Sequence, residues 1–205
     1  GGPLSSVFNI HTRKGNNKLY TAHAGISPIS AHATVEGPIV KGKSSFLFSG
    51  RSSYSDWILN QLEDPTLRDS QAKFGDLAGA LTWEPGDKTL VKAFGYMSRD
   101  QFSLGSTNDY AYSNAGASVN IRRRFGTRMN GEMALVFGEY KFSTTDQQVA
   151  SEAYQQDYRI SHYELKADMS WLSLGKHKVT YGLNGIFYDL DRGTVEPYGE
   201  LSLRV

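Results

Sequence analysis

A strict alternation of apolar and polar residues over positions 161–171 constrains the fold of this chain more than any other feature. The apolar positions are Tyr163, Leu165, Ala167, Met169 and Trp171, and the polar positions between them are His162, Glu164, Lys166, Asp168 and Ser170. A period of two places successive side chains on opposite sides of an extended strand, whereas a helix would mix the two sets on one side. The segment is therefore predicted to be a β-strand with one apolar and one polar face.

Nine segments are long strand candidates, and most of them repeat this alternation. They are 18–27, 29–36, 44–54, 71–84, 89–99, 110–124, 131–142, 158–174 and 178–188, after a short first candidate at 4–13. The two faces of 131–142 are hard to distinguish, and 189–205 shows no clear alternation. A helix of one or two turns is expected within 55–70, beginning near Asp56 and ending before Pro65.

The connections between these strands alternate between short turns and long loops. The short turns are at 37–43, 84–88, 124–130 and 174–178, and the long loops are near 55–70, 100–109, 143–157 and 189–205. Outer-membrane barrels combine short periplasmic turns with long outer loops, and they normally have an even number of strands. Trp83 and Trp171 lie on apolar rows beside short turns, where an interfacial aromatic girdle is expected. The sequence therefore predicts an all-β fold, an antiparallel transmembrane β-barrel of which about nine strands are present.

Composition excludes several other classes of protein. The 205 residues include no cysteine, which excludes thiol catalysis, cysteine-ligated metals and disulfides. The formal net charge of +1 indicates no basic face for nucleic acid. The mean hydropathy of −0.44 is compatible with a barrel, because alternating strands average their polar and apolar positions. The chain opens with Gly-Gly-Pro and no methionine, so we expect a piece of a longer protein.

The first 55 residues resemble a known family. The opening GGPLSSVFNI resembles the end of the plug domain in TonB-dependent outer-membrane receptors of the Bacteroidetes type, where the usual form is close to GGRLSSVLDI. The stretch HAGISPISAHATVEGPIVKGKSSFLFSGRSSY resembles the first three barrel strands of that family, and PYGELSLR near the end resembles part of an outer loop. Pro3 and Ser52 stand where the family often has arginine, which argues against a plug–barrel ion pair at these two positions.

The resemblance implies that residues 1–16 end the plug domain and that 17–205 form the first part of a 22-stranded barrel. It implies a receptor of the bacterial outer membrane, in contact with membrane lipid, that takes up a nutrient such as a metal chelate, a glycan or a peptide. The outer loops would capture the ligand, and the periplasmic TonB protein would pull on the plug through a part not in this chain. A surface lipoprotein acting as a lid is a further partner in some such systems, and it stays open here. No catalytic residue, cofactor or nucleic-acid partner is expected.

Candidate residues for ligand binding or transport lie on the polar rows and in the long loops. They are Arg51, Trp57, Asp76, Tyr110, Tyr112, Asn114, Tyr154, His162, Glu164 and Lys166. The polar rows would face the barrel lumen, where charged groups either contact the ligand or pair with the plug and water. Loop aromatics with polar neighbours suit glycans, other amphipathic nutrients or protein partners, and they equally suit packing between loops.

Two sets of residues were weighed as metal ligands, and two other classes of protein stay open. The two sets are His23, His32 and Glu36, and Asp189, Asp191 and Glu196. The first set depends on an unknown offset between strands and the second lacks calcium-loop spacing, so no metal site is predicted. The alternatives are a complete small outer-membrane barrel with an adhesion or structural role, and a soluble ligand-binding β-barrel. No G-x-S-x-G sequence is present, and no enzyme activity is expected.

Overall fold

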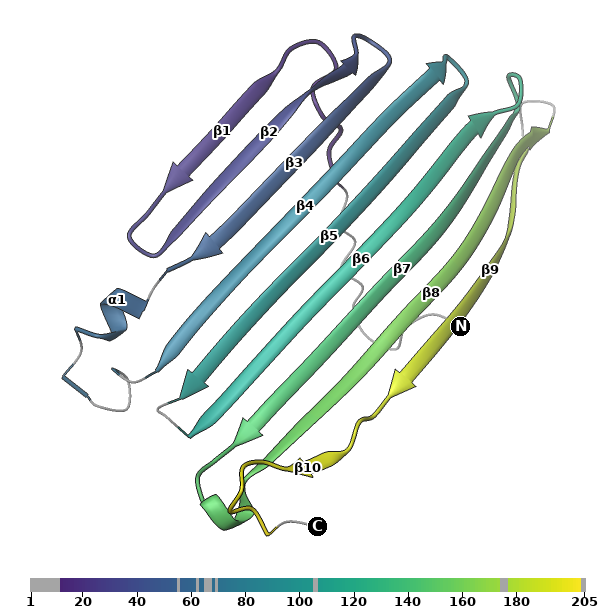
Figure 1. Cartoon of the computed structure of the whole chain (residues 1–205). Helices are drawn as coiled ribbons and strands as arrows, with labels where there is room; N and C mark the ends of the chain where they lie inside the picture. The colour runs from purple at the N-terminus through teal and green to yellow at the C-terminus, as the bar shows by residue number, and fades with distance from the viewer. Residues whose placement is uncertain are drawn as a thin grey trace.

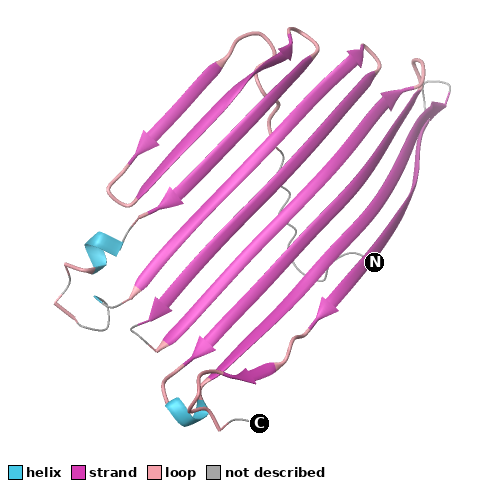
Figure 2. Ribbon diagram, in the orientation of Figure 1, coloured by secondary structure: helices cyan, strands magenta, loops and turns pink. Residues whose placement is uncertain are grey.

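The protein is all-β and forms an antiparallel sheet of ten strands (Figure 1; Figure 2). The computed structural model describes residues 12–54, 56–61, 63–64, 68, 70–104, 107–173 and 177–203. The strands are β1 (Thr21–Ile26), β2 (Ser30–Val40), β3 (Ser44–Ser53), β4 (Gln71–Gly86), β5 (Thr89–Leu104), β6 (Asn108–Arg124), β7 (Met129–Asp146), β8 (Tyr154–Ser173), β9 (His177–Asp191) and β10 (Val195–Pro197). A short helix, α1 (Asp56–Leu59), follows β3, and a 3-10 turn, η1 (Ala150–Glu152), precedes β8.

The strands follow one another in chain order across the sheet. Each of β1 to β9 pairs antiparallel with its neighbours in the sequence, and β10 pairs with the first residues of β8 beyond the end of β9. Within the described residues β1 and β9 do not pair with each other, so the sheet is open (Figure 1). The nine long strands expected from the alternation are confirmed, and closure into a barrel is not observed.

The strand register collects the apolar positions on one side of the sheet, which we call the apolar face. One row that crosses all nine long strands consists of Ala22, Val35, Phe48, Gly79, Gly95, Ala117, Phe137, Tyr163 and Phe187. The opposite side, the polar face, carries the intervening residues, including Thr34, Ser49, His162 and Tyr188. The register also resolves β7, where Met133, Leu135 and Phe137 share the apolar face and the sequence alone was ambiguous.

Nothing within the described residues covers the apolar face. Among the described residues, the buried hydrophobic ones are Ala80, on the polar face, and Ala153, between η1 and β8, whereas on the apolar face Leu183 is 81% exposed, Phe187 66% and Leu77 59%. A soluble sandwich places the apolar side of one sheet against a second sheet, and a soluble monomer rarely exposes an apolar patch of this extent. The fold therefore has an unpartnered apolar face in place of a core.

Three of the four expected long loops are shorter than the sequence indicated. The strands continue through Leu104, Asp146 and Asp191, and β6 and β8 begin at Asn108 and Tyr154. Near these strand ends both faces carry polar side chains, so the sequence shows no alternation. The strands still pair, because the hydrogen bonds between them are made by the backbone and need no apolar side chain. Residues 55–70 do connect β3 and β4 and contain α1 as expected. Most of the short candidate strand at 4–13 lies outside the described residues, and positions 12 and 13 are not in a strand.

Among the described residues, no helix has the length and apolar character needed to cross a membrane.

Candidate functional site

The polar face is the candidate functional surface because it gathers most of the charged strand residues and receives another part of the chain. Residues 12–20 cross this face near the short-turn end of the sheet, and they pass behind the strands in the view of Figure 1. This segment connects to β1 through a turn in which the Asn16 side chain accepts hydrogen bonds from the backbone N–H groups of Lys18 (2.9 Å) and Leu19 (3.1 Å). We call residues 12–19 the docked segment.

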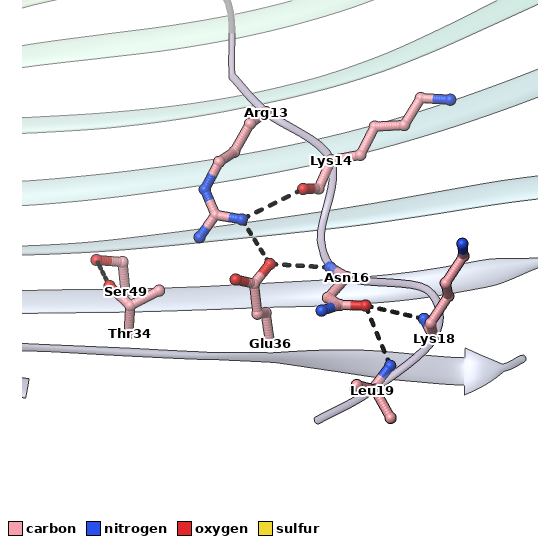
Figure 3. A network of polar contacts seen from close by, with 8 residues as sticks. All are labelled: Arg13, Lys14, Asn16, Lys18, Leu19, Thr34, Glu36 and Ser49. Carbon is pink, nitrogen blue, oxygen red and sulfur yellow. Dashed lines mark hydrogen bonds and ion pairs between the residues drawn. The ribbon is translucent and has the colours of Figure 1, made fainter. Parts of the chain in front are cut away.

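Glu36 of β2 holds the docked segment to the sheet (Figure 3). Its Oε2 atom accepts hydrogen bonds from Nη1 of Arg13 at 2.5 Å and from the backbone N–H of Asn16 at 2.8 Å. The Glu36 side chain is only 7% exposed, whereas that of Arg13 is 58% exposed. The hydrogen bond to Glu36 raises the pKa of the Arg13 guanidinium against the opposing effect of desolvation, so the arginine stays charged throughout the accessible pH range.

A second ion pair and a close backbone approach fix the same segment. Nζ of Lys14 lies 2.5 Å from Oε1 of Glu84 on β4. Gly15 is buried against β3, and a Cβ atom at this position would overlap the carbonyl oxygen of Phe46. Glycine is therefore required here because the two backbones touch.

Arg51 and Asp76, both expected at the site, form an ion pair on the polar face. They are direct cross-strand neighbours on β3 and β4, and the Arg51 Nε and Nη2 atoms lie 2.8 Å and 2.7 Å from Oδ2 of Asp76. The guanidinium carbon of Arg51 also lies 5.0 Å from the ring centre of Phe74. The pair lies within the sheet, and no described interaction joins it to the docked segment.

An aromatic cluster lies on the polar face toward the end of the sheet opposite the short turns, which we call the loop end. The ring centres of Tyr112 and Phe142 are 5.0 Å apart, those of Phe142 and Tyr158 are 5.3 Å apart, and those of Tyr140 and Tyr158 are 5.7 Å apart. These contacts follow from the register, because Tyr112, Phe142 and Tyr158 are consecutive cross-strand neighbours on β6, β7 and β8. The sequence indicated Tyr112 but not its partners on β7.

The remaining expected residues of β6 are close to this cluster. Tyr110 stacks on Phe102 of β5 with ring centres 6.4 Å apart, and the amide nitrogen of Asn114 donates to the Ser98 hydroxyl at 3.1 Å. These contacts place polar and aromatic groups of β5 and β6 on the same face as Tyr112.

The expected residues of β8 form a column of charges along one strand. Nε2 of His162 lies 3.4 Å from a carboxylate oxygen of Glu164, and Nζ of Lys166 lies 3.3 Å from a carboxylate oxygen of Asp168. His162 also packs against the ring of Tyr188 on β9, with 4.9 Å between ring centres. Each residue therefore has a partner within the sheet, two positions away or on the neighbouring strand.

Two expected residues lie at the loop end of the sheet, apart from Arg51, Asp76 and the charged residues of β8. The indole N–H of Trp57 on α1 donates to the carbonyl oxygen of Pro28 at 2.9 Å, which ties the helix to the β1–β2 turn. Tyr154 begins β8, where the register places it on the polar face opposite Asp146 and Pro197. The structure therefore does not bring the whole predicted set into one site.

The sequence placed Glu36 on a polar row and predicted pairing between such residues and the plug, but it did not identify the contacts Arg13–Glu36 and Lys14–Glu84. Arg13 and Glu36 are 23 positions apart, and Lys14 and Glu84 are 70 positions apart. A second missed cluster joins Glu132 to Asn120 (2.7 Å) and to Arg122 (2.9 Å). Basic residues in the turn cluster beginning at position 13 were visible in the sequence, but no sequence signal identifies their partners.

The structure offers no metal centre among the residues it describes, where no group of three histidine, cysteine, aspartate or glutamate side chains converges. His23 lies opposite Thr34, and His32 lies opposite Gly25, so the two histidines are not direct neighbours. Glu36 is occupied by Arg13 and Asn16.

Comparison with known proteins gives no further assignment: no family model, no curated protein and no solved structure matches the chain.

Proposed function

We propose that the chain is part of a TonB-dependent outer-membrane receptor that takes up a nutrient ligand by plug-gated active transport. One observation carries the proposal: the sheet has an uncovered apolar face, while its polar face holds a docked segment of the same chain. A lipid-facing barrel wall around an internal plug requires this combination. The resemblance of the first 55 residues to the family supports the same conclusion independently.

The dimensions of the apolar face fit a lipid bilayer. On β8 the apolar alternation extends from Tyr163 to Trp171, and a barrel strand needs about 9–11 residues to cross the hydrocarbon region. Trp83 and Trp171 end the apolar rows beside the short turns, where an aromatic girdle would contact lipid head groups. At the loop end of the same face, beyond the apolar residues, lie the charged side chains of Lys141 and Arg159.

The two open edges of the sheet also favour a barrel. Hydrocarbon offers no hydrogen-bond partner to a backbone, so a spanning sheet has to satisfy all its N–H and C=O groups internally. In the proposed receptor, further strands pair with β1 and β9 and complete the wall. A complete small barrel with an adhesion or structural role would instead require β1 to pair with β9.

The mechanism assigns the docked segment to the end of the plug. In the closed state, Glu36 and Glu84 hold Arg13 and Lys14 against the wall. Force from the periplasmic TonB protein, applied through a part not in this chain, exchanges these ion pairs for water and moves the plug. The polar face, with Arg51, Asp76, Tyr112 and the charged column of β8, then lines the transport path.

The outer loops and the aromatic cluster would meet the ligand first. The ligand class is a metal chelate, a glycan or a peptide, and a surface lipoprotein could cover the loops as a lid. The proposed cellular location of the protein is the bacterial outer membrane. No covalent bond is made or broken in this mechanism, and the chain acts as a transporter wall.

Single-cysteine variants test the orientation of the sheet, because the natural chain has no cysteine. Leu165→Cys and Lys166→Cys place thiols on the apolar and polar faces of β8, and Val119→Cys and Asn120→Cys repeat the comparison on β6. Each thiol is labelled with a nitroxide in the unfolded chain before insertion into lipid vesicles, because a thiol in hydrocarbon stays protonated and unreactive. Oxygen, which dissolves in the bilayer, should preferentially relax the labels at Leu165 and Val119, whereas a water-soluble nickel chelate should relax those at Lys166 and Asn120.

Preferential relaxation of the apolar-face labels by oxygen supports the membrane wall. Equal relaxation on both faces, or recovery of the protein as a detergent-free monomer, would overturn it in favour of the soluble β-barrel. The denatured mass separates the two membrane alternatives: a mass several-fold above 22.7 kDa fits a large receptor, and a mass of 22.7 kDa favours the small barrel.

A further inference from the structure

We infer that the loop end of the apolar face binds the phosphoethanolamine head group of one membrane lipid, with an acyl chain lying along β7–β9. The inference rests on the proposed function in one respect, since the apolar face has to meet lipid. It adds a defined lipid site, assembled by β5, β7, β8, β9 and β10, on the outside of the wall and away from the docked segment.

A hollow of about 530 Å³ lies on this face near the loop end, and three of its lining residues are basic. They are Arg99, Lys141 and Arg159. The register places all three in one row across the sheet: Arg99 is opposite Ser113 on β6, Ser113 is opposite Lys141, and Lys141 is opposite Arg159. A row of cations directly beyond an apolar band is where a lipid phosphate lies.

The bonding of these cations leaves room for an anion. Lys141 and Arg159 are like charges directly opposite each other, an arrangement that destabilises a sheet when nothing lies between them. Nε of Arg159 is buried and has no hydrogen-bond partner among the described residues. Its Nη2 atom lies 3.8 Å from Asp189 and 3.9 Å from Asp191, beyond hydrogen-bond distance. Lys141 has one carboxylate contact, to Glu139 at 2.8 Å, so a phosphate oxygen is the ligand that this row lacks.

Carboxylates farther from the bilayer fit the amine of the same head group. Asp157, Asp191 and Glu196 also line the hollow, so its three cations face three anions and its net charge is zero. Asp157 lies two positions beyond Arg159 on β8, and Glu196 of β10 lies opposite Gln155, two positions farther still. Counted outward from the bilayer, the protein therefore offers cations first and carboxylates second. This order matches a phosphoethanolamine lipid, in which the phosphate lies nearer the acyl chains than the ammonium group. Within the described residues these acids accept hydrogen bonds from neutral donors, namely the Gln155 amide, the Gly193 backbone N–H and the Thr194 hydroxyl. A purely anionic head group would add no cation to them.

An apolar hollow continues the site toward the bilayer centre. It has a volume of about 640 Å³, and its walls include Leu135, Phe137, Tyr163, Leu165 and Phe187. Its floor at Gly185 is open, since a Cβ atom there would have no neighbour within 4 Å. Arg159 and Tyr163 are four positions apart on β8, which corresponds to about 13 Å along a strand. The two hollows therefore accommodate the polar and apolar parts of one lipid.

Native mass spectrometry of the full protein, purified in detergent, tests the inference with defined lipids. The probes are dioleoyl phosphatidylethanolamine, dioleoyl phosphatidylglycerol, dioleoylglycerol and free phosphoethanolamine. We expect one phosphatidylethanolamine to be retained per chain, about tenfold more tightly than phosphatidylglycerol, because one charge-assisted contact to the amine is lost. Dioleoylglycerol and free phosphoethanolamine are each expected to compete poorly, because each lacks half of the contacts.

Four variants locate the site. Arg159→Gln should weaken retention of both phospholipids about tenfold, and Asp157→Asn should remove the preference for ethanolamine over glycerol. Gly185→Leu adds a side chain to the apolar hollow at a position where a Cβ has no neighbour within 4 Å. It should reduce binding of the long-chain lipid while leaving the head-group preference unchanged. Arg122→Gln makes the same charge change on the polar face and should have no effect.

Equal retention of phosphatidylethanolamine and phosphatidylglycerol, equal competition by free phosphoethanolamine, or an equal effect of Arg122→Gln would each overturn the lipid site. Those results leave the proposed receptor untouched if the protein still requires detergent. A detergent-free monomer would instead overturn the receptor proposal, and the lipid site with it.

Discussion

Replacing Glu36 with glutamine is expected to release the docked segment while the sheet stays folded. The carboxylate accepts from the Arg13 guanidinium at 2.5 Å and from the Asn16 backbone N–H at 2.8 Å. Glutamine has nearly the same shape, so β2 should keep its register and packing. The substitution removes the charge that makes both hydrogen bonds strong.

The magnitude follows from the exposure of the two partners. A hydrogen bond to a charged group contributes about 1.5–3 kcal/mol, and Glu36 is only 7% exposed, so its contacts are poorly replaced by water. Arg13 is 58% exposed and recovers hydration when released, which reduces the loss. The amide oxygen of glutamine still accepts from Asn16. We therefore expect the docked state to lose about 2 kcal/mol, which corresponds to an approximately 30-fold rise in the undocked-to-docked ratio.

Hydrogen exchange measured by mass spectrometry on peptides covering 12–19 provides the assay. In Glu36→Gln, amides of the docked segment should exchange about 30-fold faster, provided that they exchange through undocking. Peptides from β5 to β8 should be unchanged. Asp76→Asn is the matched control, because it neutralises a polar-face carboxylate that also binds an arginine but does not touch the docked segment. Unchanged exchange in Glu36→Gln, or the same acceleration in Asp76→Asn, would refute the assignment of Glu36 as the main anchor.

Three further outcomes are expected. Gly15→Ala should also release the docked segment, because its Cβ would overlap the Phe46 carbonyl oxygen. Gly185→Ala is the control and should not alter exchange, since its Cβ has no neighbour within 4 Å. Equal exchange in the two variants would contradict the close approach of the Gly15 and Phe46 backbones. Leu183→Lys should lower the free energy of unfolding of the membrane-inserted protein by about 2–4 kcal/mol in a urea titration with lipid vesicles, whereas Asn184→Lys on the polar face should lower it much less. Equal losses in the two variants would argue against a lipid-facing apolar face. The 205-residue chain, purified alone without detergent, should aggregate through its open edges and apolar face, and a stable monomer in size-exclusion chromatography with light scattering would count against the proposed receptor.

Much of the strand content and the division into two faces could be predicted from the sequence. Along β8, each residue from Tyr163 to Trp171 lies on the face that the alternation assigned to it. This succeeds because side-chain direction in an extended strand depends only on odd or even position. The prediction failed at strand ends such as Asp100–Leu104, where both faces meet water and no alternation is needed.

The candidate site was predictable only as a list of residues on the polar face. Alternation assigned Arg51 and Asp76 to that face, but their contact depends on an offset between β3 and β4 that neither strand encodes alone. The same is true of Tyr112 and its neighbour Phe142. For His162 and Glu164, two positions apart on one strand, proximity was implicit in the sequence.

The sequence by itself determined that this chain forms long strands with one apolar side, because a local period of two is sufficient to fix the direction of each side chain. Only the tertiary structure decided which strands meet at which register, that the sheet remains open at β1 and β9, and that Glu36 receives Arg13 from 23 positions away. These features depend on contacts between segments that are distant in the chain. The energies of such contacts belong to pairs of residues, and no single stretch of sequence contains both members of the pair.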